Sequence, residues 1–348
     1  MNSYAMENKL NKKLLLVINR YLEKKHSQLS FAVIYNDESW ILNFNQDDQM
    51  KVDVKNDRYD IGSISKIMTS LLVLHTINQK LLNLDDTIDK YLNLKKGHYP
   101  TIYQLLSHTY NYFYFTPIEI VLTSLFKKGY SRQNIYEKIN HAHVLKALER
   151  RRMRNTKGKY GYSDFGYAAL ALTLEQVYNQ PFYQLMNNFI KDHLKLQDTY
   201  CIDGSDIRVN CYLNNKKITN WRWLDDNPYI ASGGISSTIE DMRKYLDLML
   251  NSDDDIIKRS LTNFDDEKAH NVTFLLSKNR RVFWHVGGAG QFRSSLTLNP
   301  RRKIGVIVLG NSSGVISGNV HYISKMIYND IRRNRLFEKE DRTNKNDS

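Results

Sequence analysis

The chain has 348 residues, which is enough for one large domain or two closely packed ones with an ample core. Its 41% hydrophobic and 25% charged residues are ordinary for a soluble globular protein. The net charge of +13 could attract nucleic acid, anionic lipid or an acidic wall polymer, but the basic residues are spread along the chain. No nucleic-acid motif accompanies them, so we expect no nucleic-acid partner and leave an anionic cell-wall polymer open. Cys201 and Cys211 are too few for a disulfide framework or a metal cluster; they could pair after export and otherwise stay free thiols.

The N-terminal segment predicts an amphipathic helix over residues 9–27 rather than a targeting sequence. Lys9, Lys12 and Lys13 precede the short apolar run LLLVI, and charged residues follow at once without a small-residue cleavage site. No other segment is apolar for long enough to span a bilayer. We therefore expect a cytoplasmic protein with no membrane span, and nothing in the sequence indicates a metal or a cofactor.

A hairpin and a buried helix are predicted next. The strand-like runs 30–36 and 39–45 are separated by Asp37 and Glu38, which is typical of a hairpin. The run from Gly62 to Gln79 has apolar residues at helical spacing and no further Gly or Pro, which predicts a buried helix.

Residues 84–196 are predicted to be mostly helical, in the segments DDTIDKYL, TIYQLLSH, 144–149 and AALALTLEQVYN. Asp85 is a predicted N-cap and Pro181 a predicted helix start. From about residue 230 the pattern changes. A helix, EDMRKYLDLML, is predicted first, and the acidic loop NSDDD follows it. Four strand-like runs come next, and a last helix is predicted over 319–333. The runs are NVTFLLS, RVFWHV, FRSSLTL and KIGVIVLGN, with turns predicted at 278–279, 287–290 and 299–300.

Strands near both chain ends with helices between them predict an α+β fold of the α/β sandwich type. One antiparallel sheet would be built from both chain ends and covered on one face by the terminal helices, because a lone hairpin is not stable. We assign residues 9–83 and 230–335 to a discontinuous α/β sheet domain and 84–229 to a mainly helical domain. Residues 336–348 are predicted to be a flexible charged tail.

Ser63 and Lys66 in the run GSISK carry the most informative chemical signal. Residues three apart share a helix face, so the lysine amine can reach the serine hydroxyl. A partly buried lysine can take the proton of that hydroxyl and make it a nucleophile, and N–H groups at a helix start point toward a developing oxyanion. The pattern alone is weak evidence, because Ser124 and Lys127 repeat it where a solvated lysine is the ordinary explanation.

Tyr162 in KYGYSDFGY is the candidate for relaying the proton. A tyrosine hydroxyl can do this when nearby positive charge favours its phenolate. Similar Tyr-x-Asn and Tyr-x-Asp patterns recur in this chain at predicted surface positions, but Tyr162 lies between glycines and just before a packed helix.

The segment WHVGGAGQFRSS supplies a third element. His285 ends a predicted strand, and Gly287 and Gly288 let the backbone approach a ligand closely. The N–H of Gly288 beside that of Ser63 could form an oxyanion hole, each donor worth about 3–4 kcal/mol in the transition state. Taken alone, the segment is better explained as a glycine-rich hairpin with a satisfied core histidine.

Together and in this order, these segments resemble the serine β-lactamase and penicillin-recognising family. The likeness runs from about residue 12 to 330 and is greatest to the branch of class C β-lactamases, low-molecular-weight D-alanyl-D-alanine peptidases and related carboxylesterases. It rests on GSISK, TIYQLLSHT, YSDFGY, ASGGISSTIEDMRKYL, HVGGAGQFRSS and NPRRKIGVIVLGN. The resemblance implies a β-lactamase/transpeptidase-like fold with Ser63 as the acyl-accepting nucleophile and Lys66 and Tyr162 as the proton-transfer pair. It also implies that His285, Gly287 and Gly288 line the acyl site.

The chain departs from the family pattern at Asp164, at His285 and at Tyr110-Asn111, where the family usually has a small residue and Gly. Asp164 stands where class C enzymes have Asn; a carboxylate should hold Lys66 charged, shift the role of base to Tyr162 and suit a cationic or amine-bearing substrate. An Asp here is similar to that of the staphylococcal teichoic-acid D-alanyl esterase of this family. His285 replaces a Lys, and a neutral imidazole binds a substrate carboxylate less strongly. Arg293 either restores positive charge for substrate binding or is a rim residue, and both readings stay open.

The sequence therefore predicts a serine hydrolase that forms an acyl-enzyme on an ester or amide. An esterase or D-amino-acid-type peptidase is the first hypothesis, with weak or no β-lactamase activity, so the expected partner is a small-molecule, peptide or ester substrate. The alternative is a catalytically weak penicillin-binding-like protein that acts as a binding or sensing module. A third hypothesis, a basic protein that binds anionic polymer, requires positive charge clustered around the cleft.

Overall fold

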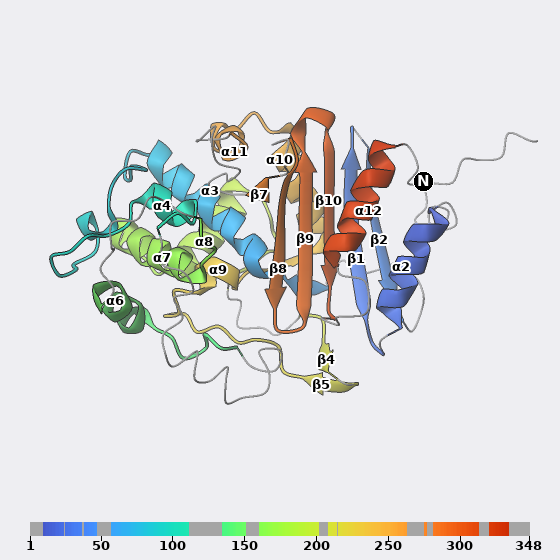
Figure 1. The fold of residues 1–348 in the computed structure, drawn as a ribbon, viewed down its shortest axis with the longest axis horizontal. Coiled ribbons are helices and arrows are strands. Elements are labelled where there is room, and N and C mark those ends of the chain that lie inside the picture. The colour runs from blue at the N-terminus through green and yellow to red at the C-terminus, as the bar shows by residue number, and fades with distance from the viewer. Residues whose placement is uncertain are drawn as a thin grey trace, which may run out of the picture.

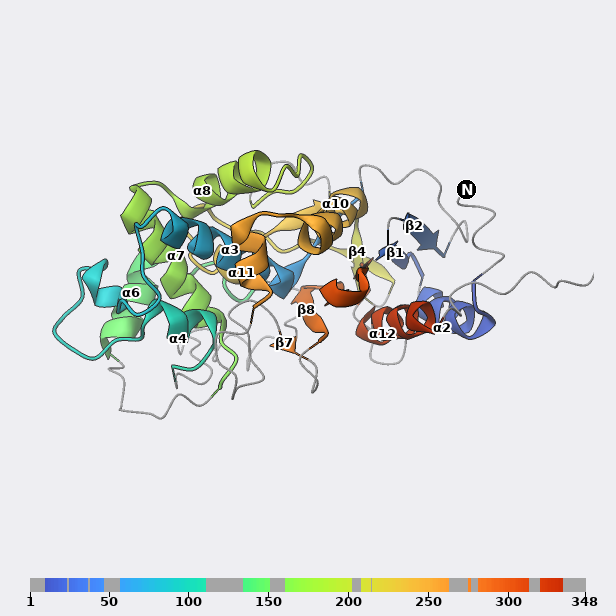
Figure 2. The ribbon, with the colours of Figure 1, turned by 90° about the horizontal axis from the view of Figure 1, so that it is seen from above.

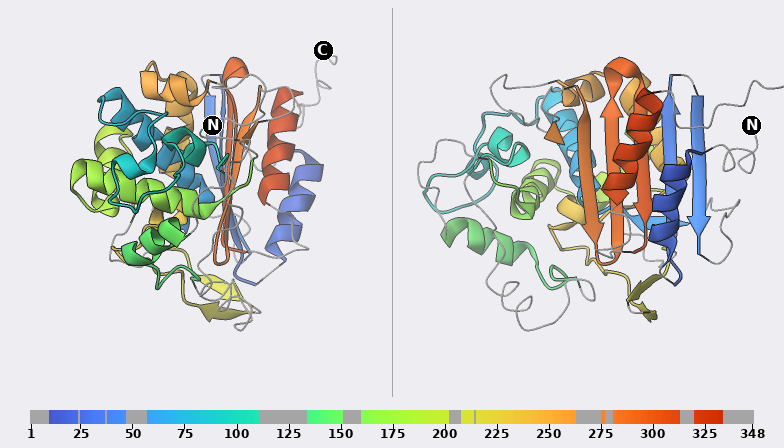
Figure 3. Two further views of the ribbon diagram at one scale, coloured as in Figure 1. Left: turned by 60° about the vertical axis from the view of Figure 1, so that its left-hand side comes forward. Right: turned by 45° about the vertical axis from the view of Figure 1, so that its right-hand side comes forward.

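The computed structural model describes residues 10–23, 25–36, 38–46, 57–110, 134–150, 160–201, 208–213, 215–262, 275–276, 281–312 and 320–333. Within these residues, helices cover both faces of one antiparallel sheet, as the edge-on view in Figure 3 shows. This confirms the predicted α+β class.

The sheet joins the two ends of the chain. Its six strands lie in the order β2-β1-β10-β9-β8-β7. β1 pairs with its hairpin partner β2 and also with β10, so that Ala32 lies between Ile41 and Ile307. The strands are β1 Gln28–Tyr35, β2 Glu38–Asn45, β7 Leu275–Leu276, β8 Phe283–Ala289, β9 Phe292–Asn299 and β10 Ile304–Gly310.

Each face of the sheet has its own core. One face carries the terminal helices α2 (Lys12–Leu22) and α12 (Val320–Arg332), which lie side by side in Figures 1 and 3. Their apolar residues pack on the outward side chains of β1, β2 and β10. The other face packs on α10 (Ile239–Asn251) and on the larger core around α3 (Ser65–Asn78). All seven residues of β10 are buried because both of its faces are covered.

The remaining helices gather beyond the β7–β8 edge of the sheet, as Figures 1 and 2 show. α3 is their centre and is buried on nearly every side, which explains why its sequence is apolar all round rather than in one stripe. The helices are α4 Ile102–Leu106, α6 His141–Arg150, α7 Asp164–Tyr178, α8 Phe182–Asn188, α9 Ile230–Gly233 and α11 Asp255–Ser260. The short turns are η1 Gly62–Ile64, η2 Ile88–Lys90, the π-turn η3 Phe189–His193 and η4 Pro300–Arg302.

Two small strand pairs complete the described structure. β3 (Arg58–Asp60) pairs with β6 (Ser236–Thr238), which brings the approach to Ser63 beside the segment after α9. β4 (Cys211–Leu213) pairs with β5 (Lys216–Ile218) at one end of the main sheet, below β9 in Figure 1.

Three local predictions were wrong. DDTIDKYL forms only the turn η2, without Asp85 as a cap, because Thr87 bridges to Thr101 and holds the chain extended. Part of the acidic loop is helical, because Asp254 caps α11 by accepting from the amides of Ile256 and Ile257. The turn predicted at 287–290 starts later, because β8 stays paired with β9 as far as Ala289.

The division into domains stays a prediction, as does the location of the protein in the cell. The charged tail 336–348, the turn at 278–279 and the second Ser-x-x-Lys pair lie outside the described residues. Cys201 and Cys211 are both buried free thiols. None of the helices in the described ranges combines the length and hydropathy that a membrane span requires.

Candidate active site

Ser63 and Lys66 lie where η1 runs into α3, and their side chains meet. Lys66 is fully buried, and its Nζ lies 3.2 Å from Oγ of Ser63, 2.7 Å from the carbonyl oxygen of Ser232 in α9 and 2.6 Å from Oδ1 of Asp164. An ammonium has three N–H donors, and these three oxygens match them one to one. The site therefore holds Lys66 as a buried, fully hydrogen-bonded cation.

Tyr162 joins this pair just before α7. Its ring centroid lies 5.0 Å from Nζ of Lys66 and 4.7 Å from the ring of His108. Burial raises the pKa of Tyr162 well above its ordinary value, and the negative charge of Asp164 raises it further; a hydrogen bond with Ser63 offsets part of the rise. Hydroxyl, amine and phenol thus converge in one place, and the phenol is in its neutral form.

Asp164 begins α7 and is the counter-charge of Lys66. Its Oδ1 binds Lys66, and its Oδ2 accepts a hydrogen bond of 2.7 Å from the hydroxyl of Tyr136. Burial by itself would raise the pKa of Asp164, but the charge of Lys66 and the hydrogen bonds from Lys66 and Tyr136 outweigh it and lower the pKa. The Asp164 side chain is 27% exposed and that of Lys66 is 1% exposed, so the carboxylate forms the outer side of the ion pair.

β8 lies directly against the turn that carries Ser63. Gly62 has a left-handed backbone (φ +51°), and a Cβ built on it would lie 2.4 Å from the amide nitrogen of Gly288. A Cβ on Gly287 would lie 2.1 Å from the carbonyl oxygen of Ile61, which also accepts a hydrogen bond of 2.7 Å from Oγ of Ser294. The absence of side chains at Gly62 and Gly287 is what lets the amide of Gly288 approach the nucleophile turn.

We expect Gly287→Ala to push β8 away from η1, because the new methyl group would overlap backbone that cannot move aside cheaply. The free energy of unfolding should fall by about 3 kcal/mol, measured by thermal or urea unfolding. Gly97→Ala is the matched control, since the nearest atom to its Cβ is the Tyr99 ring at 3.3 Å. Equal stability of the two variants would contradict this close contact.

His285 is neutral and nearly inaccessible, at 4% exposure. Its Nδ1 lies 2.9 Å from the carbonyl oxygen of Val286, so Nδ1 carries the proton and donates, which leaves Nε2 as an acceptor. Burial and the charge of Lys66 lower the pKa of His285 to about 4. Its ring centroid lies 6.2 Å from that of Tyr162. Because the ring is neutral and Nε2 is an acceptor, His285 offers this side of the site a hydrogen-bond acceptor and no positive charge.

The structure does not bring the Arg293 side chain to the cluster of Ser63, Lys66 and Tyr162. In the register of the sheet, Arg293 lies opposite Gly288 and Gly310, on the face that carries α2 and α12. Its Nη1 donates to the carbonyl oxygens of Gly290 and Phe292, at 3.0 and 2.6 Å. The next residue, Ser294, faces the nucleophile turn, and side chains alternate along a strand. The predicted substrate-binding role of Arg293 is therefore corrected.

The beta-lactamase family model matches residues 17–320. The chain belongs to the beta-lactamase family. This is a family of serine hydrolases, and it confirms the resemblance drawn from the sequence motifs.

Relatives and solved structures agree with the family. Protein flp of Staphylococcus aureus (strain COL) is 23% identical over 89% of this chain, and the chain spans only 64% of the length of that relative. An octameric penicillin-binding protein homologue from Pyrococcus abyssi has a TM-score of 0.73 at 19% identity. The superposition covers 93% of this chain and 77% of the chain of that homologue. A beta-lactamase/D-alanine carboxypeptidase from Yersinia pestis has a TM-score of 0.72 at 18% identity, covering 92% and 100%. These likenesses establish the β-lactamase/transpeptidase-like fold.

Sequence reasoning missed three residues of this beta-lactamase-family site. Ser232 contributes its carbonyl oxygen to Lys66, and Tyr136 holds the outer oxygen of Asp164. His108 accepts a hydrogen bond of 3.2 Å from the amide of Ser163 and packs on the ring of Tyr162, so it fixes the loop that carries the phenol. Ser232 and His108 lie in blocks that the family resemblance used, whereas no spacing in the sequence relates Tyr136 to Asp164. In the described residues, no three His, Cys, Asp or Glu side chains are grouped to hold a metal ion.

Proposed function

We propose that this chain hydrolyses esters or amides through an acyl-enzyme on Ser63. The observation that carries the proposal is the meeting of Ser63, Lys66 and Tyr162 in one buried cluster. A serine becomes an effective nucleophile when a neighbouring group can take its proton, and Tyr162 is near enough to Ser63 for Ser63 to lower the pKa of its phenol.

Tyr162 acts as the general base in its phenolate form. Oγ of Ser63 bonds to the substrate carbonyl carbon while its proton moves to the Tyr162 oxygen, and that proton then passes to the leaving oxygen or nitrogen. In the second half of the reaction, water attacks the acyl carbon and gives its proton to Tyr162, which returns it to Oγ of Ser63. Lys66 stays an ammonium throughout, paired with Asp164, and its positive charge, 5.0 Å from the centroid of the Tyr162 ring, favours the phenolate.

The oxyanion of each tetrahedral intermediate lies between the amides of Ser63 and Gly288. The close packing of Gly62 on Gly288 supports this role, because it brings the two amide-bearing segments together. Donors fixed in this way need no reorganisation as charge develops, and each contributes about 3 kcal/mol.

The charges around the cluster favour an ester or a D-amino-acid-type peptide over a β-lactam. The ammonium of Lys66 is already used by three oxygens, and His285 is neutral, so neither offers a strong site for a substrate carboxylate. The outer edge of Asp164 and Nε2 of His285 are acceptors, which suits a substrate with an amine or hydroxyl group.

One observation favours the alternative, a binding or sensing module. The Lys66 amine is engaged in an ion pair with Asp164, and burial raises the pKa of the Tyr162 phenol. The third hypothesis, a cleft that attracts anionic polymer, gains no support from the described residues of the site, because Lys66 and Asp164 neutralise each other.

A substrate screen separates the hydrolase from the binding module. We expect the purified protein to hydrolyse p-nitrophenyl acetate or butyrate, with D-alanyl peptides as the next class and nitrocefin turned over weakly or not at all. A fluorescent penicillin that labels the protein stably, with no turnover of any ester or peptide, would replace the proposal with the binding role.

A further inference from the structure

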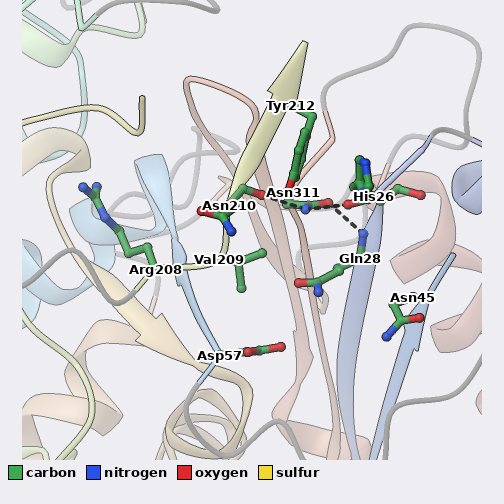
Figure 4. A pocket seen from close by; sticks show the side chains of 10 residues that line it. His26, Gln28, Asn45, Asp57, Arg208, Val209, Asn210, Tyr212 and Asn311 are labelled. Carbon is green, nitrogen blue, oxygen red and sulfur yellow. Dashed lines mark hydrogen bonds between the residues drawn. The ribbon is translucent and has the colours of Figure 1, made fainter. Parts of the chain in front are cut away.

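A pocket of about 290 Å³ lies away from Ser63, at the end of the sheet where β1 begins and β2 and β10 end. Figure 4 shows four amide side chains around it, those of Gln28, Asn45, Asn210 and Asn311. Its volume is near the lower limit of about 300–1,000 Å³ for small-molecule sites and far above the ~10–15 Å³ that one water needs. The size fits a ligand of one or two rings.

The wall of the pocket is held in place by one amide. Asn311 accepts a hydrogen bond of 2.7 Å from the amide of Gln28 and donates at 3.0 Å to the carbonyl oxygens of both His26 and Asn210. These residues come from three separate segments of the chain, which meet here as Figure 4 shows. The site is therefore formed before any ligand arrives.

An aromatic pair lies on one side of the pocket. The rings of His26 and Tyr212 are stacked, with centroids 4.4 Å apart and an angle of 27°. The amide of His26 donates to Oε1 of Gln46 at 2.8 Å, which fixes the backbone behind its ring. Tyr212 is partly exposed, so its ring stands at the rim.

Two buried polar atoms in the lining have no partner among the described residues. Oγ of Ser27 and Oε1 of Gln28 make no hydrogen bond to any residue that the structure describes, and Ser27 is only 2% exposed. Buried polar atoms are nearly always paired, because leaving them unpaired costs free energy. Both residues line the pocket, so a rotation of either side chain would bring its unpaired oxygen to an occupant that can donate a hydrogen bond.

The charges of the lining argue against an anionic occupant. Nη1 of Arg208 lies 3.0 and 2.9 Å from the two carboxylate oxygens of Asp60 and also donates to the carbonyl oxygen of Trp221 at 2.8 Å. Its charge is thus compensated within the protein, while the carboxylate of Asp57 also lines the pocket and repels anions. The chemistry favours a neutral molecule with many hydroxyl groups.

We propose that this pocket binds a sugar. A pyranose ring has an apolar C–H face, which can lie against the Tyr212 ring, and hydroxyl groups that both donate and accept, as amide side chains do. Once the side chains of Ser27 and Gln28 rotate toward the pocket, the sugar hydroxyls bond to Oγ of Ser27 and Oε1 of Gln28. The binding does not depend on hydrolysis at Ser63, whose side chain is not part of the lining.

The test is a titration of the full chain with glucose, N-acetylglucosamine, maltose and, separately, inorganic phosphate, followed by calorimetry and saturation-transfer NMR. We expect at least one saccharide to bind in the millimolar range and phosphate not to bind. Tyr212→Ala should weaken saccharide binding about tenfold, and Tyr212→Phe should keep it. Tyr322→Ala removes a tyrosine that is 49% exposed on α12 and is the matched control.

Gln28→Leu is the second variant, because it removes the unpaired acceptor with little change in volume and keeps the backbone amide that Asn311 binds. It should weaken saccharide binding while the melting temperature stays the same or rises, since the orphaned polar atom is gone. Three results overturn the proposal: no saccharide binds, binding is unchanged in both Tyr212→Ala and Gln28→Leu, or phosphate binds and displaces the saccharide.

Discussion

Ser63→Ala is expected to reduce ester hydrolysis by about 10⁴-fold or more, because the acyl group then has no oxygen to bond to. The free energy of unfolding should fall by about 1–3 kcal/mol, since the variant leaves one N–H donor of the buried Lys66 without its serine partner. The measurement is the p-nitrophenyl ester rate, together with the intact mass of the protein after rapid quenching. Wild type should show the added acyl group and the variant should not.

Ser252→Ala is the matched control for this loss. The Ser252 hydroxyl accepts from the amide of Asp254 at the end of α10, so the substitution removes a hydrogen-bonded serine without touching the site. Its rate should equal that of wild type. If Ser63→Ala kept the wild-type rate, the acyl-enzyme mechanism would have to be abandoned.

Asp164→Asn is expected to shift the pH dependence of hydrolysis to lower pH. The negative charge of Asp164 raises the pKa of Tyr162, so its removal lowers that pKa and increases the phenolate fraction at a given pH. Far below the pKa, the phenolate fraction rises about tenfold when the pKa falls by about one, and the ester rate at neutral pH should rise in proportion. The same change should also raise activity on β-lactams such as nitrocefin, since an amide can donate to a substrate and a carboxylate cannot.

Tyr136→Phe separates charge from hydrogen bonding in this experiment. It removes the bond to Oδ2 of Asp164 but keeps the carboxylate charge, so its pH–rate curve should stay close to that of wild type. A curve for Asp164→Asn that coincides with wild type would show that Asp164 does not restrain the base. Nitrocefin rates equal to or below wild type would show that Asp164 is not what excludes β-lactams.

The parts of the site that depend on short-range geometry could be predicted from the sequence. Ser63 and Lys66 are one helical turn apart, so their contact follows from the helix period alone. The hairpin of β1 and β2 and the helix α3 followed in the same way from local spacing. The prediction that Tyr162 joins Ser63 and Lys66 depended on the order of the family motifs along the chain. No local rule relates loops that lie so far apart in the sequence.

The placement of Arg293 shows where sequence reasoning stops. Side chains alternate between the faces of a strand, so the face of Arg293 depends on the exact residue at which β8 turns into β9. The sequence indicated a turn from Gly287, whereas pairing continues to Ala289 and puts Arg293 opposite Gly288. Tyr136 was missed for a related reason: its bond to Asp164 depends on tertiary packing and leaves no periodic trace.

The pairing of β1 with β10 determines when the site can form during synthesis of the chain. Ala32 near the start of the chain needs Ile307 near its end, and Gly288 leaves the ribosome long after Ser63. Contacts between such distant residues form slowly, because a long loop must close before they yield any stabilisation. Hydrolysis is therefore expected to begin only after β10 has been synthesised and has paired with β1.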